Sequence, residues 1–191
     1  MTLSRSQQFI IAAVLAVLMI VTRGHHFASV DALPSASWAI FFLLGLYLSS
    51  AAWMPIFLIL AAALDVSAVL WGGVTNSACL SPAYGFLVPA YGSLWLAGRW
   101  YASHYQFKLQ TLLPLIASVV VGTATSAVFS GGGYYFFSGN YIDPTIAEYS
   151  QRFVNSFTSH LSVMAFYLVL AMIAHIVFRA AQLSQRANQQ H

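Results

Sequence analysis

The chain has 191 residues, of which 60% are hydrophobic, 15% aromatic and only 6% charged, with a mean hydropathy of +0.76. A soluble domain carries roughly 25% charged residues, so most of this exterior must face lipid. The composition therefore excludes soluble catalytic folds, nucleic-acid-binding domains, disulfide scaffolds and disordered tails.

Apolar runs separated by polar or Gly/Pro-bearing segments predict a single six-helix transmembrane domain over 1–191. The alternating pattern of a membrane β-barrel is absent, so an all-α bundle is expected. Asp143-Pro144 predicts an N-cap and first helical residue ahead of the last span, and a helix from there to Arg179 would be about 52 Å long, which forces it to break or to project from the bilayer. The six expected helices cover 7–22, 36–51, 53–72, 84–102, 110–131 and 154–180.

The charges predict the orientation of these helices. With an even number of spans, five basic residues fall on one side of the membrane (Arg5, Arg99, Lys108, Arg179 and Arg186) and two on the other (Arg23 and Arg152). The excess of Lys and Arg marks the cytoplasmic side, so both termini are expected in the cytoplasm of a multi-pass inner-membrane protein. The acidic residues gather at the opposite, outer end, which predicts a cup that opens outward.

Cys79 is the only cysteine, and it lies in a turn-rich segment between the third and fourth expected helices. A thiolate is a soft ligand for a transition metal. One thiol cannot complete a tetrahedral site, so a metal bound here would bring most of its own ligands, as in an organic macrocycle. The alternative is that Cys79 is a small apolar residue of a loop.

Four further residues carry polar groups toward the same end. Asp65 interrupts an apolar helix and must face the bundle interior, either as a ligand or proton site or as a structural partner of a neighbouring hydroxyl. His25 and His26 follow the first helix, and at most one of them is expected to enter a cavity. Arg152 either pairs with Glu148 on the helix surface or begins a cavity-lining polar stripe with Asn155, Ser159 and Ser162.

These residues together resemble a known family. A six-helix chain of this length, with the small-residue pair Ala12 and Ala16 in its first helix, resembles the S-components of energy-coupling factor (ECF) vitamin transporters. Asp65 and the stretch Asn-Ser-Ala-Cys-Leu-Ser-Pro-Ala-Tyr-Gly over 76–85 look like the BtuM-type solitary cobalamin transporters. The resemblance implies an S-component-like bundle with an outward-facing pocket for cobalamin.

The resemblance also implies roles for single residues. Cys79 would ligate the cobalt of cobalamin and could promote loss of the upper cyano ligand. His26, Asp65, Tyr84 and Arg152 would contact the corrin amides or the nucleotide loop. The sequence has no Walker A pattern, so energy would come from an ECF module contacting Ala12 and Ala16, or transport would be passive.

Two other classes of function stay open at the level of sequence. The chain could be a membrane oxidoreductase or a cobalamin-modifying enzyme that uses Cys79 as a reactive thiol, or a small assembly subunit. Visible absorption of the purified protein separates these classes, because a bound corrinoid, a bound haem and the absence of a chromophore give different spectra.

Overall fold

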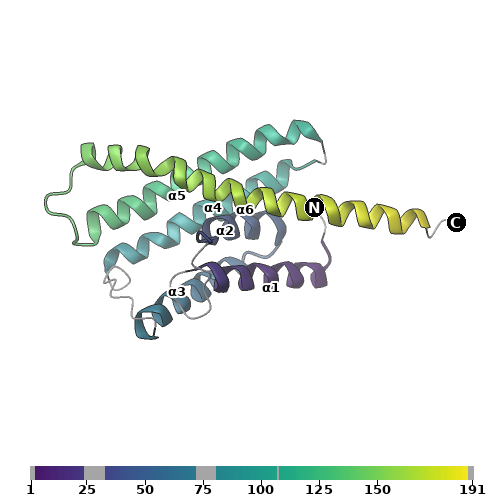
Figure 1. The fold of residues 1–191 in the computed structure, drawn as a ribbon, viewed down its shortest axis with the longest axis horizontal. Coiled ribbons are helices and arrows are strands. Elements are labelled where there is room, and N and C mark those ends of the chain that lie inside the picture. Colours follow the sequence, from purple (N-terminus) through teal and green to yellow (C-terminus); the bar gives the residue numbers. More distant parts are fainter. Residues whose placement is uncertain (1–2, 24–32, 72–80, 107, 189–191) are drawn as a thin grey trace.

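A computed structural model describes residues 3–23, 33–71, 81–106 and 108–188, which are all-helical without a strand (Figure 1). It confirms the expected number of α-helices. Successive helices alternate in direction. The loop 138–145, which connects the last two helices, lies at one end of the bundle, and we call this end of the bundle the 138–145 end. The α-helices are α1 (Arg5–Thr22), α2 (Ser37–Tyr47), α3 (Trp53–Trp71), α4 (Leu87–His104), α5 (Leu112–Phe137) and α6 (Ile146–Asn188), with 3-10 turns η2 (Pro82–Phe86) and η3 (Leu109–Thr111).

Four helical stretches are long and apolar enough to cross a bilayer, namely Arg5–Thr22, Trp53–Leu70, Leu109–Phe137 and Ile146–Phe178. They indicate a multi-pass membrane protein. Two of the six expected spans differ from this group. α2 has 11 residues and is about 16 Å long, well short of a ~30 Å hydrocarbon core, while α4 is less apolar because it carries Ser93, Arg99 and His104.

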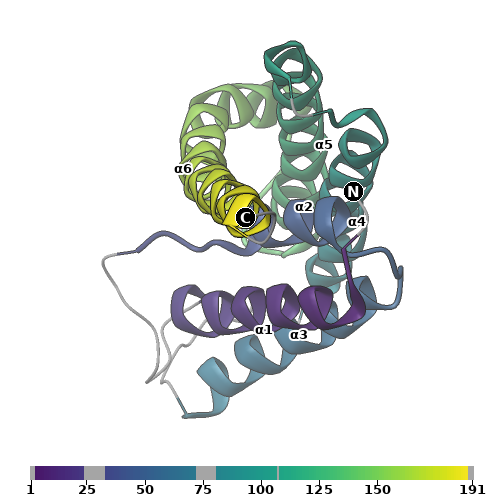
Figure 2. The same ribbon diagram turned by 90° about the vertical axis from the view of Figure 1, so that its right-hand side faces the viewer.

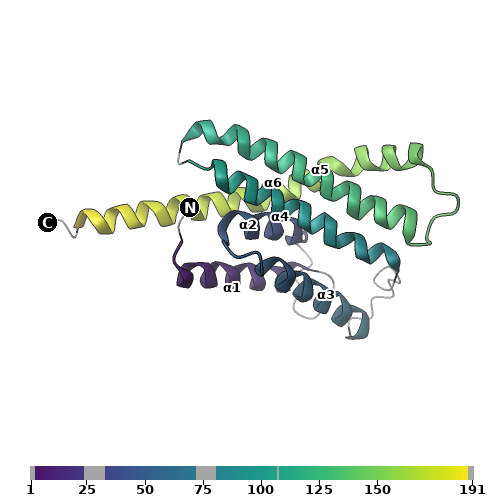
Figure 3. The same cartoon turned by 180° about the vertical axis from the view of Figure 1, so that it is seen from behind.

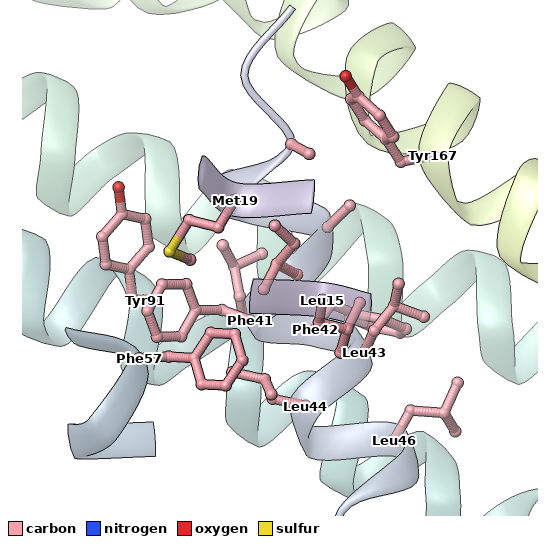
Figure 4. Close-up of a cluster of buried hydrophobic side chains, with 14 of the residues drawn as sticks. Leu15, Met19, Phe41, Phe42, Leu43, Leu44, Leu46, Phe57, Tyr91 and Tyr167 are labelled. Carbon is pink, nitrogen blue, oxygen red and sulfur yellow. The ribbon is translucent and has the colours of Figure 1, made fainter. Parts of the chain in front are cut away.

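α2 is the centre of the bundle rather than a full span. It contacts α1, α3, α4 and α6, and all but two of its residues are buried. Figure 2 shows α1 and α3 side by side on one side of α2, with α5 and α6 on the other. The core of the molecule forms around its phenylalanines: Phe41 stacks on Tyr91 at 4.2 Å between ring centroids, and Phe42 is fully buried (Figure 4).

α2 ends at Tyr47, although the apolar pattern predicts a helix to residue 51. Two side chains from neighbouring helices bind the backbone where it ends. Gln8 Oε1 accepts from the Ser49 amide at 3.1 Å and from the Ser49 hydroxyl at 2.9 Å. Arg99 Nη1 donates to the Leu48 carbonyl at 3.1 Å. These contacts replace the helical hydrogen bonds that a longer α2 would have made.

α2 and α4 cross with their backbones in contact, at Gly45 and Gly98. A Cβ atom on Gly45 would lie 2.0 Å from the Trp95 carbonyl oxygen, and one on Gly98 would lie 2.0 Å from the Phe42 carbonyl oxygen. Only glycine fits at such distances, and small residues have the same role at close crossings of membrane helices. α4 in turn lies along α5, as Figure 3 shows from behind.

The predicted end of the fifth helix at residue 131 is wrong, because α5 continues through three glycines to Phe137. The absence of side chains makes room for neighbours, since a Cβ atom on Gly133 would lie 2.5 Å from Phe86 Cβ. The predicted N-cap Asp143 is also wrong. Asp143 has a φ of 51°, and Thr145 Oγ1 instead accepts from the Glu148 amide at 3.3 Å at the start of α6.

α6 is one continuous helix of 43 residues, about 65 Å long. Of the two expectations for this segment, projection is therefore the correct one: Figure 1 shows its C-terminal part extending beyond the other helices. In α1, Ala12 is buried in the core and Ala16 is partly buried, whereas Phe9, Ile10 and Val14 are exposed on the face expected to meet lipid.

Candidate functional site

Asp65 lies in the last third of α3 and is paired with Arg23, the residue that caps the C-terminal end of α1. Arg23 Nε donates to Asp65 Oδ1 at 2.8 Å, and Arg23 Nη2 donates to Oδ2 at 2.7 Å. Their side chains are 8% and 17% exposed. A bidentate arginine–carboxylate pair is the strongest form of ion pair, and it lets two charges sit at this depth in an apolar bundle.

Three more side chains complete this arrangement, which we call the polar cluster. Arg23 Nη1 donates to Ser37 Oγ at 2.8 Å and to the Tyr91 hydroxyl at 2.7 Å, and the Tyr84 hydroxyl donates to Asp65 Oδ2 at 2.8 Å. The cluster therefore joins α1, α2, α3, η2 and α4 at the 138–145 end. The carboxylate accepts three hydrogen bonds, as a buried charge requires.

Tyr84 supplies a hydroxyl that stays protonated. It lies in η2, outside the four long apolar helices. Burial raises the pKa of Tyr84 above its usual value, and the hydrogen bond to Asp65 raises this pKa further. Tyr84 is therefore a donor throughout the physiological pH range.

Arg152 lies in a separate region of the same end of the bundle. Arg152 Nε and Nη2 donate to Glu148 Oε1 at 3.0 and 2.8 Å, which confirms the expected pair four residues apart. The other oxygen, Glu148 Oε2, accepts from the Tyr135 hydroxyl at 2.8 Å. The Arg152 guanidinium lies over two aromatic rings, 4.9 Å from the Tyr141 centroid and 5.6 Å from the Tyr135 centroid.

A cavity of about 520 Å³ opens between α5 and α6 beside Arg152. We call it the α5–α6 cavity. Its walls are mostly aromatic, and Asp65 and Tyr84 are not among its lining residues. It is lined by Ala127, Gly131, Tyr134, Tyr135, Tyr141, Tyr149, Arg152, Phe153, Asn155, Ser156 and His160.

The expected polar stripe on the last helix reaches this cavity only in part. Arg152 and Asn155 line it, whereas Ser159 and Ser162 are exposed and do not. The face of α6 that turns inward runs instead through Arg152, Ser156 and His160. The difference arises because this inward face follows spacings of four residues, whereas the predicted stripe alternates between three and four.

A second cavity, of about 290 Å³, lies at the opposite end between α2, α4, α5 and α6. Most of its walls are apolar, including Phe42, Leu46 and Leu168. His175 lies on its wall, with Nδ1 3.4 Å from the Tyr47 hydroxyl and Nε2 3.0 Å from the Tyr105 hydroxyl. This cavity is separate from every residue that the sequence singled out as a ligand contact.

Cys79, His25 and His26 lie outside the described residues. Within the ranges given above for the structure, no three His, Cys, Asp or Glu side chains come together as a metal site. The sequence-based prediction does not include Arg23 in the site, because its place after the first helix identifies it only as an indicator of topology. The signal was present, because a carboxylate inside an apolar helix needs a partner and Arg23 is a basic residue at the same expected depth.

No protein-family model and no curated protein match this chain.

Proposed function

We propose that this protein is a cobalamin transporter of the cytoplasmic membrane, and that it binds the vitamin at the 138–145 end, which faces outward. The observation that carries the proposal is the hydrogen bond of 2.8 Å between Tyr84 and Asp65. These two expected ligand contacts are 19 positions apart and belong to different elements. Cys79 belongs to the segment that joins those elements, two positions before Ser81.

The chemistry of this end suits a large ligand rich in hydrogen-bond acceptors. Cys79 would supply a soft thiolate to cobalt, and one histidine of the loop after α1, His26 in our assignment, would contact the ligand. Arg152 adds a donor, and the Tyr84 oxygen adds an acceptor, since its proton is donated to Asp65. The α5–α6 cavity adds aromatic walls. Cobalamin itself contributes the metal and its macrocycle, so the protein needs to provide only an axial ligand and contacts at the periphery.

Binding is tested with purified protein and cobalamin by gel filtration and visible absorption. We expect the wild type to retain the corrinoid with an altered spectrum. Cys79→Ser should restore the spectrum of free cobalamin and weaken retention, because a hydroxyl is a poor ligand for cobalt. An unchanged spectrum with full retention in Cys79→Ser would remove this residue from the metal. A haem spectrum, or no chromophore after incubation, would instead favour an oxidoreductase or an assembly subunit.

Transport requires a second measurement. Proteoliposomes that contain only this chain should accumulate labelled cobalamin if uptake is passive with trapping of the vitamin inside. Uptake only after an ECF energising module is added would indicate coupling through a partner. Of the two expected contacts, Ala16 is partly exposed, whereas Ala12 is buried against this chain's own core. Binding without uptake in either preparation would contradict the assignment as a transporter.

A further inference from the structure

His160 is the one imidazole on the wall of the α5–α6 cavity among the described residues. It lies on α6 two turns after Arg152, on the face that continues inward with the buried residues Met164 and Tyr167. Its ring stacks on Trp38 of α2, with 4.6 Å between centroids and 18° between planes. This stacking fixes the plane of the imidazole while leaving it exposed to the cavity.

Several groups on the cavity wall have donor or acceptor atoms that make no hydrogen bond within the described part of the chain. Neither ring nitrogen of His160 has a hydrogen-bond partner there, and neither does the Tyr141 hydroxyl. Arg152 binds Glu148 through Nε and Nη2, which leaves Nη1 without such a partner. The Tyr134 hydroxyl accepts from Asn140 Nδ2 at 3.1 Å and keeps its own proton to donate.

These groups are mainly donors on aromatic walls. Charge gives no preference for an anion, because Glu148 balances Arg152. A neutral wall of this kind suits an uncharged or singly charged group with exposed acceptor oxygens, such as an amide carbonyl or a phosphodiester, beside a flat ring face. Cobalamin offers both oxygens, the first on its corrin side chains and the second in its nucleotide loop.

We propose that His160 is a ligand-contacting residue, which donates from a ring nitrogen to an acceptor oxygen of the corrinoid while Arg152 Nη1 and Tyr141 bind neighbouring oxygens. This inference rests on the proposed function. The stack on Trp38 sets the direction of the donated hydrogen bond, so the ring nitrogen needs little reordering when the ligand enters.

The test compares two variants that separate hydrogen bonding from packing. His160→Phe keeps the stack on Trp38 and removes the ring nitrogens, and His160→Gln keeps a donor without the ring. We expect His160→Phe to weaken cobalamin binding about fivefold, the effect of one lost hydrogen bond, and His160→Gln to bind more tightly than His160→Phe. His104→Phe is the matched control, because His104 is exposed at the opposite end of the bundle, and it should bind as the wild type does.

A labelling measurement on the wild type does not depend on how the variants fold. Diethyl pyrocarbonate modifies accessible imidazoles, and mass spectrometry reads each site. Cobalamin should slow modification of His160 and leave that of His104 unchanged. Cobinamide, which lacks the nucleotide loop, identifies the acceptor: protection by both corrinoids indicates a corrin amide, and protection by cobalamin alone indicates the phosphodiester.

The outcomes distinguish the two proposals. A wild type that binds no corrinoid would overturn the proposed function and this inference with it. A wild type that binds cobalamin while His160→Phe binds equally well, or while His160 stays unprotected, would overturn the inference alone.

Discussion

Arg23 and Asp65 form a bidentate ion pair across 42 positions of sequence, and this pair links the end of α1 to α3. Among the described residues, this end of α1 also contacts the bundle through Arg23 Nη1, which donates to Ser37 and Tyr91, and through Thr22 Oγ1, which accepts from the Ala36 amide at 3.1 Å. Within the described part of the chain, the pair is therefore the polar connection that holds the end of α1 against α3.

Removal of one member of the pair should destabilise the protein strongly. In Arg23→Gln the Asp65 carboxylate loses two of its three donors, and in Asp65→Asn the buried guanidinium loses its counter-ion. Leaving one partner of a buried pair uncompensated costs about 3 kcal/mol or more. Thermal unfolding in detergent should show a clearly lowered midpoint for each single variant.

The double variant Arg23→Gln/Asp65→Asn is the informative control. It removes both charges and keeps side chains that can hydrogen-bond to each other, so it should recover much of the loss, with a favourable coupling in the double-mutant cycle. Arg152→Gln should have little effect on unfolding, because its pair with Glu148 is about half exposed. Single variants as stable as the wild type would show that the pair does not hold α1.

Gly98→Ala should separate α2 from α4. The added methyl group would lie 2.0 Å from the Phe42 carbonyl oxygen, and backbone atoms cannot move aside as a side chain can. Overpacking of this kind typically costs about 1–3 kcal/mol. We expect a lowered unfolding midpoint, together with weaker cobalamin binding because Tyr91 of the polar cluster lies on the displaced helix.

Gly92→Ala is the matched substitution on the same helix. A Cβ atom there would meet only Met54 Cε at 3.5 Å, an ordinary contact, and alanine favours helix more than glycine does. Its unfolding midpoint should equal or exceed that of the wild type. Equal unfolding midpoints for Gly98→Ala and the wild type would mean that α2 and α4 lie farther apart at Gly98 than in this structure.

The helices themselves were predictable, because an apolar run long enough to span lipid has no alternative to helix. The ends of the helices were harder to predict from the sequence. α2 ends where Gln8 and Arg99 bind its last backbone groups, and α5 continues through Gly131–Gly133 because Phe86 and Tyr149 fill the space above them. Both effects depend on residues distant in sequence, which a local pattern does not contain.

The candidate site was predictable to a similar degree. A charge at Asp65 is costly enough in lipid to mark the position by itself, and Glu148 and Arg152 are helix neighbours by spacing. Ser37, Tyr91 and His160 were not predictable, since nothing in their local sequence distinguishes them from packing residues. Their roles follow from how α2, α4 and α6 are placed against one another.

The orientation of the chain can be tested at Cys79. With both termini in the cytoplasm, Cys79 should react with a membrane-impermeant maleimide added to intact spheroplasts, because the basic residues are concentrated on the other side. Added cobalamin should slow this reaction if the thiol binds cobalt. Labelling that appears only after the cytoplasmic face is opened would reverse the orientation, and equal labelling with and without cobalamin would argue against coordination.

Cobalt coordination by Cys79 should also release cyanide from cyanocobalamin. Positive charge or direct binding to a metal lowers the pKa of a thiol from its free value of about 8.5, so the thiol can lose its proton as the cobalt–sulfur bond forms. The cobalt–cyanide bond breaks, the cyanide leaves with that proton as hydrogen cyanide, and the oxidation state of cobalt does not change. We expect slow loss of cyanide that accompanies binding, without turnover.

The measurement is to incubate wild type and Cys79→Ala with cyanocobalamin, to release the corrinoid by denaturation, and to separate its cyano and aquo forms by chromatography. The wild type should yield cyanide-free corrinoid in an amount that does not exceed the protein present, because each thiol acts once and stays bound. Cys79→Ala should return cyanocobalamin unchanged. Equal cyanide retention in both proteins would rule out the ligand exchange while leaving uptake of the vitamin to be judged by the transport assay. Loss of cyanide in several-fold excess over protein would instead indicate an enzyme, since a single ligand exchange per molecule cannot account for it.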